Sequence, residues 1–108
     1  YQMWYTSTRD YGYLGEWDWQ IGYAESDDGL TWTRRSEPVL ESAGELVSPS
    51  VYFDGVQYHM WYESLSVAGK ADIDYAVSPD GLEWTDYWAN PVLGSCGEQY
   101  EFPNVLYN

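Results

Sequence analysis

The sequence predicts an all-β fold built from two copies of one unit of four antiparallel strands. The composition contains 12 Tyr and 7 Trp residues, and aromatic residues favour strands. Short stretches with alternating faces are separated by Asp-Gly and Pro-Asp-Gly turns, which is the pattern of β-hairpins. The same stretches occur twice in the 108 residues, and no segment of useful length shows the helical period.

The repeated unit is about 54 residues long. YQMWY at the start of the chain returns as YHMWY after a shift of 57 residues, and IGYAESDDGLTWT returns as IDYAVSPDGLEWT after a shift of 52. PVL returns after 53 residues, and SPSVYFD returns as FPNVLYN after 54. We therefore treat residues 1–108 as a single segment with internal repeats at approximately 1–54 and 55–108.

Each unit is expected to contain four short strands. In the unit that begins at Val47, VSPSVYF is joined to QYHMWYE by the Asp54-Gly55 turn, which is a strong hairpin signal. IDYAVS follows, then a turn from Pro79 to Gly81, the strand LEWTD, and PVL as the outermost and weakest strand. Antiparallel units of this kind, repeated about every 40 to 55 residues, are typical of β-propeller blades. The sequence therefore predicts a β-propeller segment with two blade-equivalents of four antiparallel strands.

The two ends of the chain are expected to fall within the innermost hairpin of a blade. By the repeat, Asn108 corresponds to Asp54, and the equivalent of Tyr1 would follow three residues later. The chain then holds one complete blade, from Val47 to Leu93, with parts of two others. Because a lone strand leaves an unpaired edge, we expect a closed homo-oligomeric ring. A trimer with six blades is the first choice, and a dimer with four blades is the alternative.

The charge and cysteine content restrict the function further. The formal net charge of −14 excludes a polyanion such as nucleic acid as a partner, whereas neutral sugars and cations stay open. Cys96 is the single cysteine, which predicts a small buried thiol and no intrachain disulfide. No apolar run approaches the ~18 residues of a membrane span, and no signal peptide is visible. No cofactor and no metal site are expected.

The stretches SPSVYFDGVQYHMWYE, IDYAVSPDGLEWT and PVL resemble the five-bladed propellers of the arabinanase, levansucrase and invertase superfamily. That superfamily includes glycoside hydrolase families 32, 43 and 68 and similar uncharacterised bacterial proteins. Its innermost strands carry acidic residues toward a central funnel, and one of them has a Glu two residues before a proline. EFPN has this pattern, so the resemblance implies that Glu101 is a general acid. It also implies a furanoside ligand, such as a fructan or an arabinan.

Three functions remain open. The first copy has Val47 and Ser48 where carboxylates would stand, so only one of the two carboxylates expected for glycoside hydrolysis is recognisable. We favour a carbohydrate-binding, glycosidase-like propeller with little or no hydrolysis. The alternatives are an active furanoside hydrolase, or a fragment of one, that uses Glu101 as its general acid, and a purely structural self-assembling module.

The repeat also separates architectural positions from candidate ligand-binding positions. Residues that occur in both copies are predicted to pack between blades or to form turns: Trp4 and Trp61, Trp32 and Trp84, Tyr23 and Tyr75, and Asp28 and Asp80. Exposed aromatic rings beside carboxylates are typical of sugar sites. The candidates that break the repeat are Trp17, Trp19, Trp88, Tyr100 and Glu63. Alternatively, the aromatic candidates cover a neighbouring blade or a subunit contact.

Three further polar residues have local interpretations. His59 lies within an alternating strand without a nearby Cys or His, so we interpret it as a hydrogen-bonded strand residue rather than a metal ligand. Asp72 and Asp74 are two residues apart and are expected to share one face of a strand, where they are solvated or bind a cation.

Overall fold

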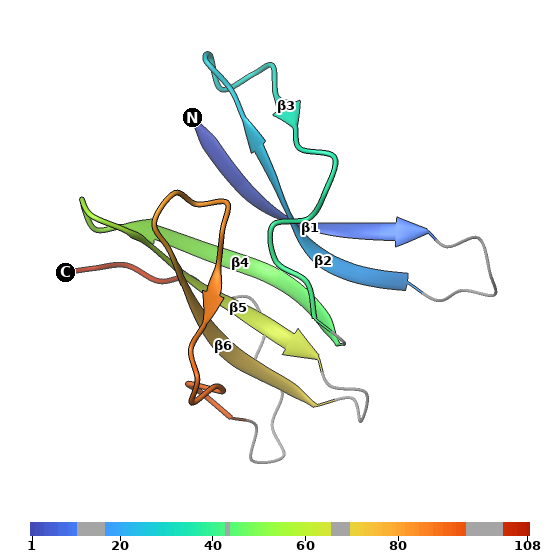
Figure 1. Ribbon diagram of the computed structural model, residues 1–108, viewed down its shortest axis with the longest axis vertical. Helices are drawn as coiled ribbons and strands as arrows, with labels where there is room; N and C mark the ends of the chain where they lie inside the picture. Colours follow the sequence, from blue (N-terminus) through green and yellow to red (C-terminus); the bar gives the residue numbers. More distant parts are fainter. Residues whose placement is uncertain (11–16, 43, 66–69, 95–102) are drawn as a thin grey trace.

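A computed structural model describes residues 1–10, 17–42, 44–65, 70–94 and 103–108 (Figure 1). These residues contain seven strands and no helix, which confirms the all-β prediction. The strands form two antiparallel sheets. The first sheet contains β1 (Gln2–Asp10), β2 (Trp17–Glu25) and β3 (Thr33–Arg34) in that order. The second contains β4 (Glu45–Phe53), β5 (Tyr58–Leu65), β6 (Ala71–Ser78) and β7 (Thr85–Asp86) in that order.

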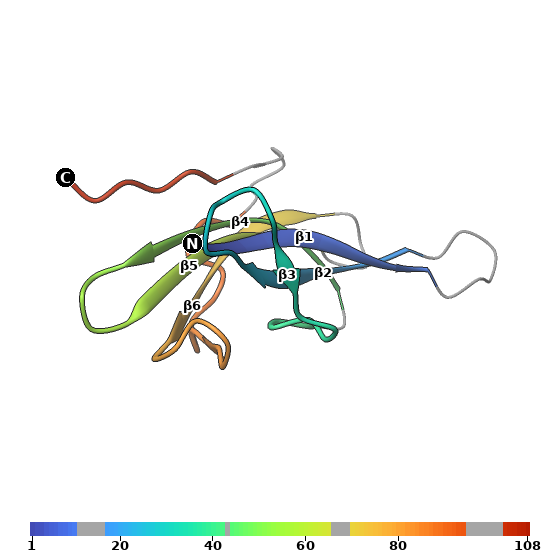
Figure 2. The ribbon, with the colours of Figure 1, turned by 90° about the horizontal axis from the view of Figure 1, so that it is seen from above.

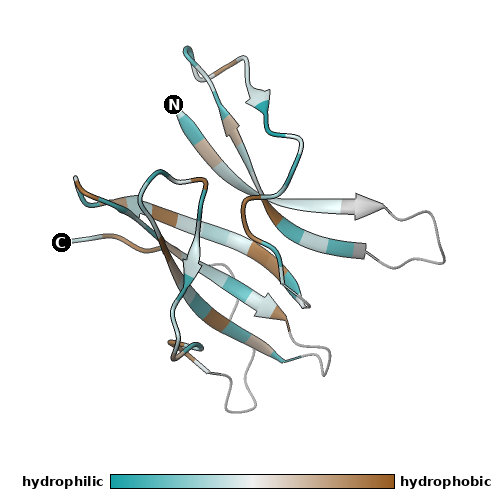
Figure 3. Cartoon of the chain, in the orientation of Figure 1, coloured by the Kyte–Doolittle hydropathy of each residue, from teal (hydrophilic) through white to brown (hydrophobic). Residues whose placement is uncertain are grey.

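The two sheets carry the sequence repeat in matching registers. Trp4 pairs with Tyr23 across β1 and β2, and Trp61 pairs with Tyr75 across β5 and β6. Strands β1, β2 and β3 therefore correspond to β5, β6 and β7. Figure 3 shows hydropathy changing from residue to residue along these strands, as expected when alternate side chains point to opposite faces.

The expected strand LEWTD is shorter than predicted, because only Thr85–Asp86 forms β7. The backbone N–H groups of Leu82 and Glu83 instead donate to the carboxylate of Asp80, at 2.9 Å each, so they are not available to a sheet. The PVL segment lies next to the same strand as β7, where Leu93 forms an antiparallel bridge with Ile73. In the first sheet, Leu40 and Ile21 form the equivalent bridge.

The two repeated turns are closed by an aspartate, as the sequence predicted. In the first, one oxygen of Asp28 accepts the N–H groups of Leu30 and Thr31, at 2.8 Å each. The hydroxyl of Ser26 accepts the N–H of Gly29 at 2.8 Å, and the indole of Trp32 donates to the Gly29 carbonyl at 3.2 Å. Gly29 has a φ of 77°, a conformation that favours glycine. The second turn repeats this arrangement around Gly81, which has a φ of 81°.

These hydrogen bonds predict a contribution of Asp28 to stability in acid. The N–H groups of Thr31 and Leu30, with the Ser26 hydroxyl, lower the pKa of Asp28 from 3.8 to about 2. A depressed folded-state pKa stabilises the fold above the unfolded value, and that contribution is lost as the pH falls toward the folded value. We expect Asp28→Asn to flatten the fall in stability between about pH 4 and pH 2. Chemical unfolding at several pH values measures this.

Asp27→Asn is the matched control, because it removes the same charge from the adjacent exposed position of the same turn. It should leave the slope of stability against pH close to that of the wild type. Equal slopes for wild type and Asp28→Asn would contradict the assignment of the acid dependence to Asp28.

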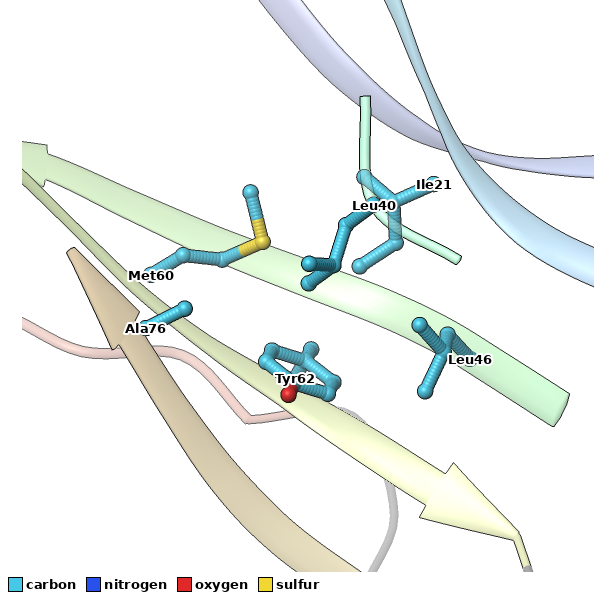
Figure 4. Close-up of a cluster of buried hydrophobic side chains, with 6 residues drawn as sticks. All are labelled: Ile21, Leu40, Leu46, Met60, Tyr62 and Ala76. Atoms are coloured by element: carbon cyan, nitrogen blue, oxygen red, sulfur yellow. The ribbon is translucent and has the colours of Figure 1, made fainter. Parts of the chain in front are cut away.

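The hydrophobic core lies between the two sheets (Figure 4). The first sheet and its following loop contribute Ile21 and Leu40, and the second sheet contributes the remaining side chains: Leu46, Met60, Tyr62 and Ala76. Tyr62 is 2% exposed, and its hydroxyl donates to Asp86 at 2.7 Å. Burial and the neighbouring carboxylates raise the pKa of this phenol. The sheets are also linked where the Ser48 N–H donates to the Thr6 hydroxyl at 2.9 Å.

Trp4 forms the clearest contact between the two repeats. It projects from β1 onto the Gly81 turn of the second sheet, where its indole N–H donates to the Gly81 carbonyl at 2.8 Å. Its ring lies 5.5 Å from Tyr58 and 6.2 Å from Trp84, measured between centroids. On its own sheet it contacts Tyr23 at 5.4 Å. The predicted role of Trp4 in packing one repeat on the next is therefore confirmed. We call this contact the Trp4 joint.

Residues 103–108 lie beside β4 in both views (Figures 1 and 2). The Val105 N–H donates to the Ser50 hydroxyl at 3.0 Å, and the Tyr107 ring stacks on Tyr52 at 5.7 Å. The sequence predicted an innermost strand here, but these residues form none. The bond that links Val105 to β4 ends on a side chain, whereas a strand requires a ladder between backbones.

Candidate functional site

One face of the second sheet, directed away from the first sheet, carries a continuous row of aromatic rings. We call it the aromatic face: Tyr52, His59, Trp61, Tyr75, Tyr87 and Trp88. The two-residue period of β5 places His59 and Trp61 on this face together. Each ring lies between 5.1 and 6.3 Å from the next. These separations are typical of interacting aromatic pairs, so the row forms one packed surface.

A chain of hydrogen bonds runs through the aromatic face. The Asp54 carboxylate contacts Nε2 of His59 at 2.7 Å, and Nδ1 of His59 contacts the Tyr75 hydroxyl at 2.6 Å. When the imidazole is neutral, the carboxylate accepts the Nε2 proton and Tyr75 donates to Nδ1. These bonds fix the orientation of both rings. The interpretation of His59 as a hydrogen-bonded strand residue is confirmed.

The two residues at the ends of this hydrogen-bond network, Asp54 and Tyr75, have pKa values shifted from their usual values. The N–H of Gln57, the His59 hydrogen bond and the N–H of Val56 lower the pKa of Asp54 to about 2. Burial, with a smaller effect of the Asp54 charge, raises the pKa of Tyr75. Asp54 is therefore ionised and Tyr75 is neutral at neutral pH. The aromatic face thus combines flat apolar rings with a fixed carboxylate and a hydroxyl.

The outer end of the aromatic face is open to solvent. Trp88 is 89% exposed, and its ring contacts Tyr87, which is 40% exposed, at 5.7 Å. Asn90 holds the backbone beneath them, because its amide accepts the Tyr75 N–H at 2.9 Å and donates to the Tyr75 carbonyl at 3.0 Å. A large exposed ring on a fixed backbone can stack against the apolar face of a sugar.

Within the described part of the chain, the predicted ligand-binding positions lie on different strands and in both sheets. Trp88 follows β7, the edge strand of the second sheet, whereas Trp17 and Trp19 lie at the beginning of β2 in the first sheet. Glu63 lies in β5, opposite Val47 and Ile73, and is 4% exposed. The structure brings Trp88 together with Tyr87 and Tyr75, which were not among the ligand candidates. The ligand candidate Tyr100, the predicted general acid Glu101 and the predicted buried thiol Cys96 fall outside the described residues.

Asp72 and Asp74 share one face of β6, as expected from their spacing, with Ser64 and Tyr62 as their respective partners across β5. Burial raises the pKa of Asp74, the Ser64 hydroxyl opposes this effect, and the neighbouring carboxylates Asp86 and Asp72 add to it. Within the described ranges, no group of three or more His, Cys, Asp or Glu is placed to hold a metal ion.

The first sheet carries a polar cleft of about 310 Å³ on the face directed away from the second sheet. Tyr5, Ser7 and Gln20 form its floor, and Arg34 and Arg35 stand beside it. These arginines are two of the four basic residues in the chain, and Glu37 lines the cleft with them. No helix in the described part of the chain is long and apolar enough to cross a membrane.

Comparisons with known proteins find similarity to proteins of Mycobacterium tuberculosis. The chain is 34% identical over 89 residues to an uncharacterised protein of strain CDC 1551 and, with the same values, to an uncharacterised protein of strain H37Rv. The match covers 78% of this chain but 29% of each relative, so the chain spans less than a third of their length. No family model and no solved structure matches the chain.

Proposed function

We propose that this chain is a segment of a glycosidase-like β-propeller that binds carbohydrate. The observation that carries the proposal is the exposed pair Tyr87 and Trp88, at the outer end of the aromatic face. Sugars bind where their C–H faces stack on aromatic rings and their hydroxyls meet polar groups.

The propeller architecture of the proposal is supported by how the two repeats are arranged. The repeats form separate antiparallel sheets that pack through their faces, and residues 103–108, which correspond to residues 49–54 in the repeat, lie beside β4. Because 89 residues make up 29% of each mycobacterial relative, those proteins have roughly 300 residues. That length accommodates roughly five or six units of the size repeated in this chain, as a propeller requires.

The repeat also indicates that Trp88, at the outer end of the aromatic face, stays accessible to solvent in a propeller. The N–H of Tyr87 donates to the Tyr75 carbonyl at 2.8 Å, just as the N–H of Arg35 donates to the Tyr23 carbonyl at 2.9 Å. Trp88 therefore occupies the position of Ser36, which is exposed although the first sheet is covered by the second. A further unit packed on the aromatic face would leave Trp88 free to meet a ligand.

The proposal is limited to binding. Hydrolysis requires two carboxylates at a defined separation, and Glu101 lies outside the described residues. A furanoside ligand follows from the resemblance in sequence alone.

Calorimetric titration with arabinan and levan oligosaccharides tests the proposal. We expect Trp88→Ala to weaken binding about tenfold, because it removes the most exposed stacking ring, and Trp88→Phe to restore most of the affinity. The double variant Trp17→Ala, Trp19→Ala tests whether the first sheet contributes. Absence of binding by the wild type, or equal binding by Trp88→Ala, would contradict a carbohydrate site at the outer end of the aromatic face.

A further inference from the structure

The Trp4 joint has two halves, and each half occurs a second time on the surface of the chain. In the joint, an indole from one repeat meets an Asp-Gly turn of the next repeat, framed by Tyr58 and Trp84. Trp61 is the repeat equivalent of this indole, and the Gly29 turn is the equivalent of the Gly81 turn. One chain therefore carries one closed joint and the two halves of another.

The indole half is already formed on the aromatic face. Trp61 contacts Tyr75 at 5.1 Å, just as Trp4 contacts Tyr23 at 5.4 Å. The supporting tyrosines differ in burial, because Tyr23 is 6% exposed and Tyr75 is only half-buried. The second sheet covers the Trp4–Tyr23 pair of the first sheet. The equivalent Trp61–Tyr75 pair lies on the face of the second sheet that is directed away from the first.

The turn half is formed at the other end of the molecule. The Tyr1 ring lies 3.7 Å from the position that a side chain on Gly29 would occupy, and the Tyr58 ring lies 3.6 Å from the equivalent position on Gly81. Trp32 donates to the Gly29 carbonyl, as Trp84 donates to the Gly81 carbonyl. The Gly81 carbonyl accepts a second N–H from Trp4, so a carbonyl in this turn has room for two donors.

The exposed fractions of equivalent residues show that the surface around the Gly29 turn lacks the neighbouring repeat that covers the Gly81 turn. Met60 is 0% exposed in the second sheet, whereas its equivalent Met3 is 38% exposed. Leu82 is partly buried beneath the first sheet, in contact with a cleft that Tyr23 and Arg35 also line, whereas its equivalent Leu30 is 86% exposed. The same segments of sequence are buried where a neighbouring repeat covers them and exposed where none does.

We propose that a second copy of this chain covers these surfaces, with Trp61 of one copy bound at the Gly29 turn of the next. The Trp61 indole N–H donates to the Gly29 carbonyl, and Leu30 packs against the aromatic face beside Tyr75. The contact continues the interface between the two sheets, so it is a head-to-tail contact that generates a ring when the rotation closes. A cleft of about 510 Å³ lined by Tyr1 and Asp28 adjoins the turn.

This inference rests on the propeller architecture of the proposed function but not on its carbohydrate ligand. Sedimentation velocity of the 108-residue chain tests it at an ionic strength of about 0.15 M, where a Debye length of about 8 Å screens repulsion between chains of charge −14. We expect the wild type to sediment as a discrete oligomer of the 12.5 kDa chain, the trimer first.

Leu30→Asp should dissociate that oligomer, with a loss of at least about 30-fold in association constant for a buried contact at the centre of an interface. Val56→Asp is the matched control. Val56 is 83% exposed, and its N–H bonds to Asp54 at 2.8 Å as that of Leu30 bonds to Asp28. It should leave the oligomer intact, while Trp61→Ala should dissociate it with retention of the β-sheet circular dichroism.

A folded wild-type monomer at every concentration would overturn the inference, as would an oligomer that both Leu30→Asp and Trp61→Ala leave unchanged. Glycan titration separates this result from the proposed function. Binding of arabinan or levan by a monomer contradicts only the assembly, whereas a ring that Leu30→Asp dissociates but that binds neither glycan contradicts only the carbohydrate site.

Discussion

Trp4→Ala is expected to destabilise the fold by about 3 kcal/mol, because a large side chain packed between two sheets is replaced by a methyl group. The lost contacts are those with Tyr23, Tyr58 and Trp84. The Gly81 carbonyl keeps one donor, the indole of Trp84 at 2.9 Å, so the effect comes from packing rather than from an orphaned acceptor. A loss of this size is a large fraction of the 5–15 kcal/mol that holds a typical domain folded.

Urea unfolding followed by circular dichroism measures the effect. Trp88→Ala is the control, because it removes the same side chain from a position that is 89% exposed. It should change the free energy of unfolding by no more than about 0.5 kcal/mol. Comparable losses in the two variants would show that Trp4 does not connect the repeats as described.

Gly81→Ala is expected to have the second large effect, of about 2–4 kcal/mol. Two causes add: an alanine at a φ of 81° is strained by roughly 1–2 kcal/mol, and its methyl group would lie 2.7 Å from the Trp4 ring. The ring cannot move aside freely, because its indole N–H is bound to the carbonyl of the same residue.

Gly55→Ala separates the two causes. Gly55 also has a positive φ, of 96°, but nothing lies within 4 Å of the position that its side chain would occupy. The control should therefore show only the backbone strain. Thermal or urea unfolding of both variants gives the comparison, and equal losses would mean that Trp4 yields to the added methyl group without cost.

Much of the fold could be predicted because comparison of the two copies shows which residues alternate along strands and which residues form turns. The all-β class, the closure of the turns by Asp28 and Asp80, and the contact of Trp4 with the next repeat all follow from local rules applied twice. The length of the last strand did not, because Asp80 competes with the sheet for the backbone N–H groups of Leu82 and Glu83.

The candidate site was harder to predict. Repetition identified Tyr75 as architectural, yet the same ring also belongs to a hydrogen-bonded chain with His59 and Asp54, residues from two other segments. This hydrogen-bond network depends on the register between β4, β5 and β6, which the spacing of residues within one strand does not predict. Tyr87 was not among the candidates, although it also breaks the repeat, because its equivalent is Arg35, and this difference is the signal that could have identified it.

The central claim is that one repeat packs on the next through an indole that contacts an Asp-Gly turn. A double-mutant cycle between Trp4 and Gly81 tests this claim most directly. In the Trp4→Ala background, no ring opposes the methyl group of Gly81→Ala, so its cost should fall to the strain seen in Gly55→Ala. The predicted coupling is at least about 1 kcal/mol. Additive effects of the two substitutions would contradict the claim.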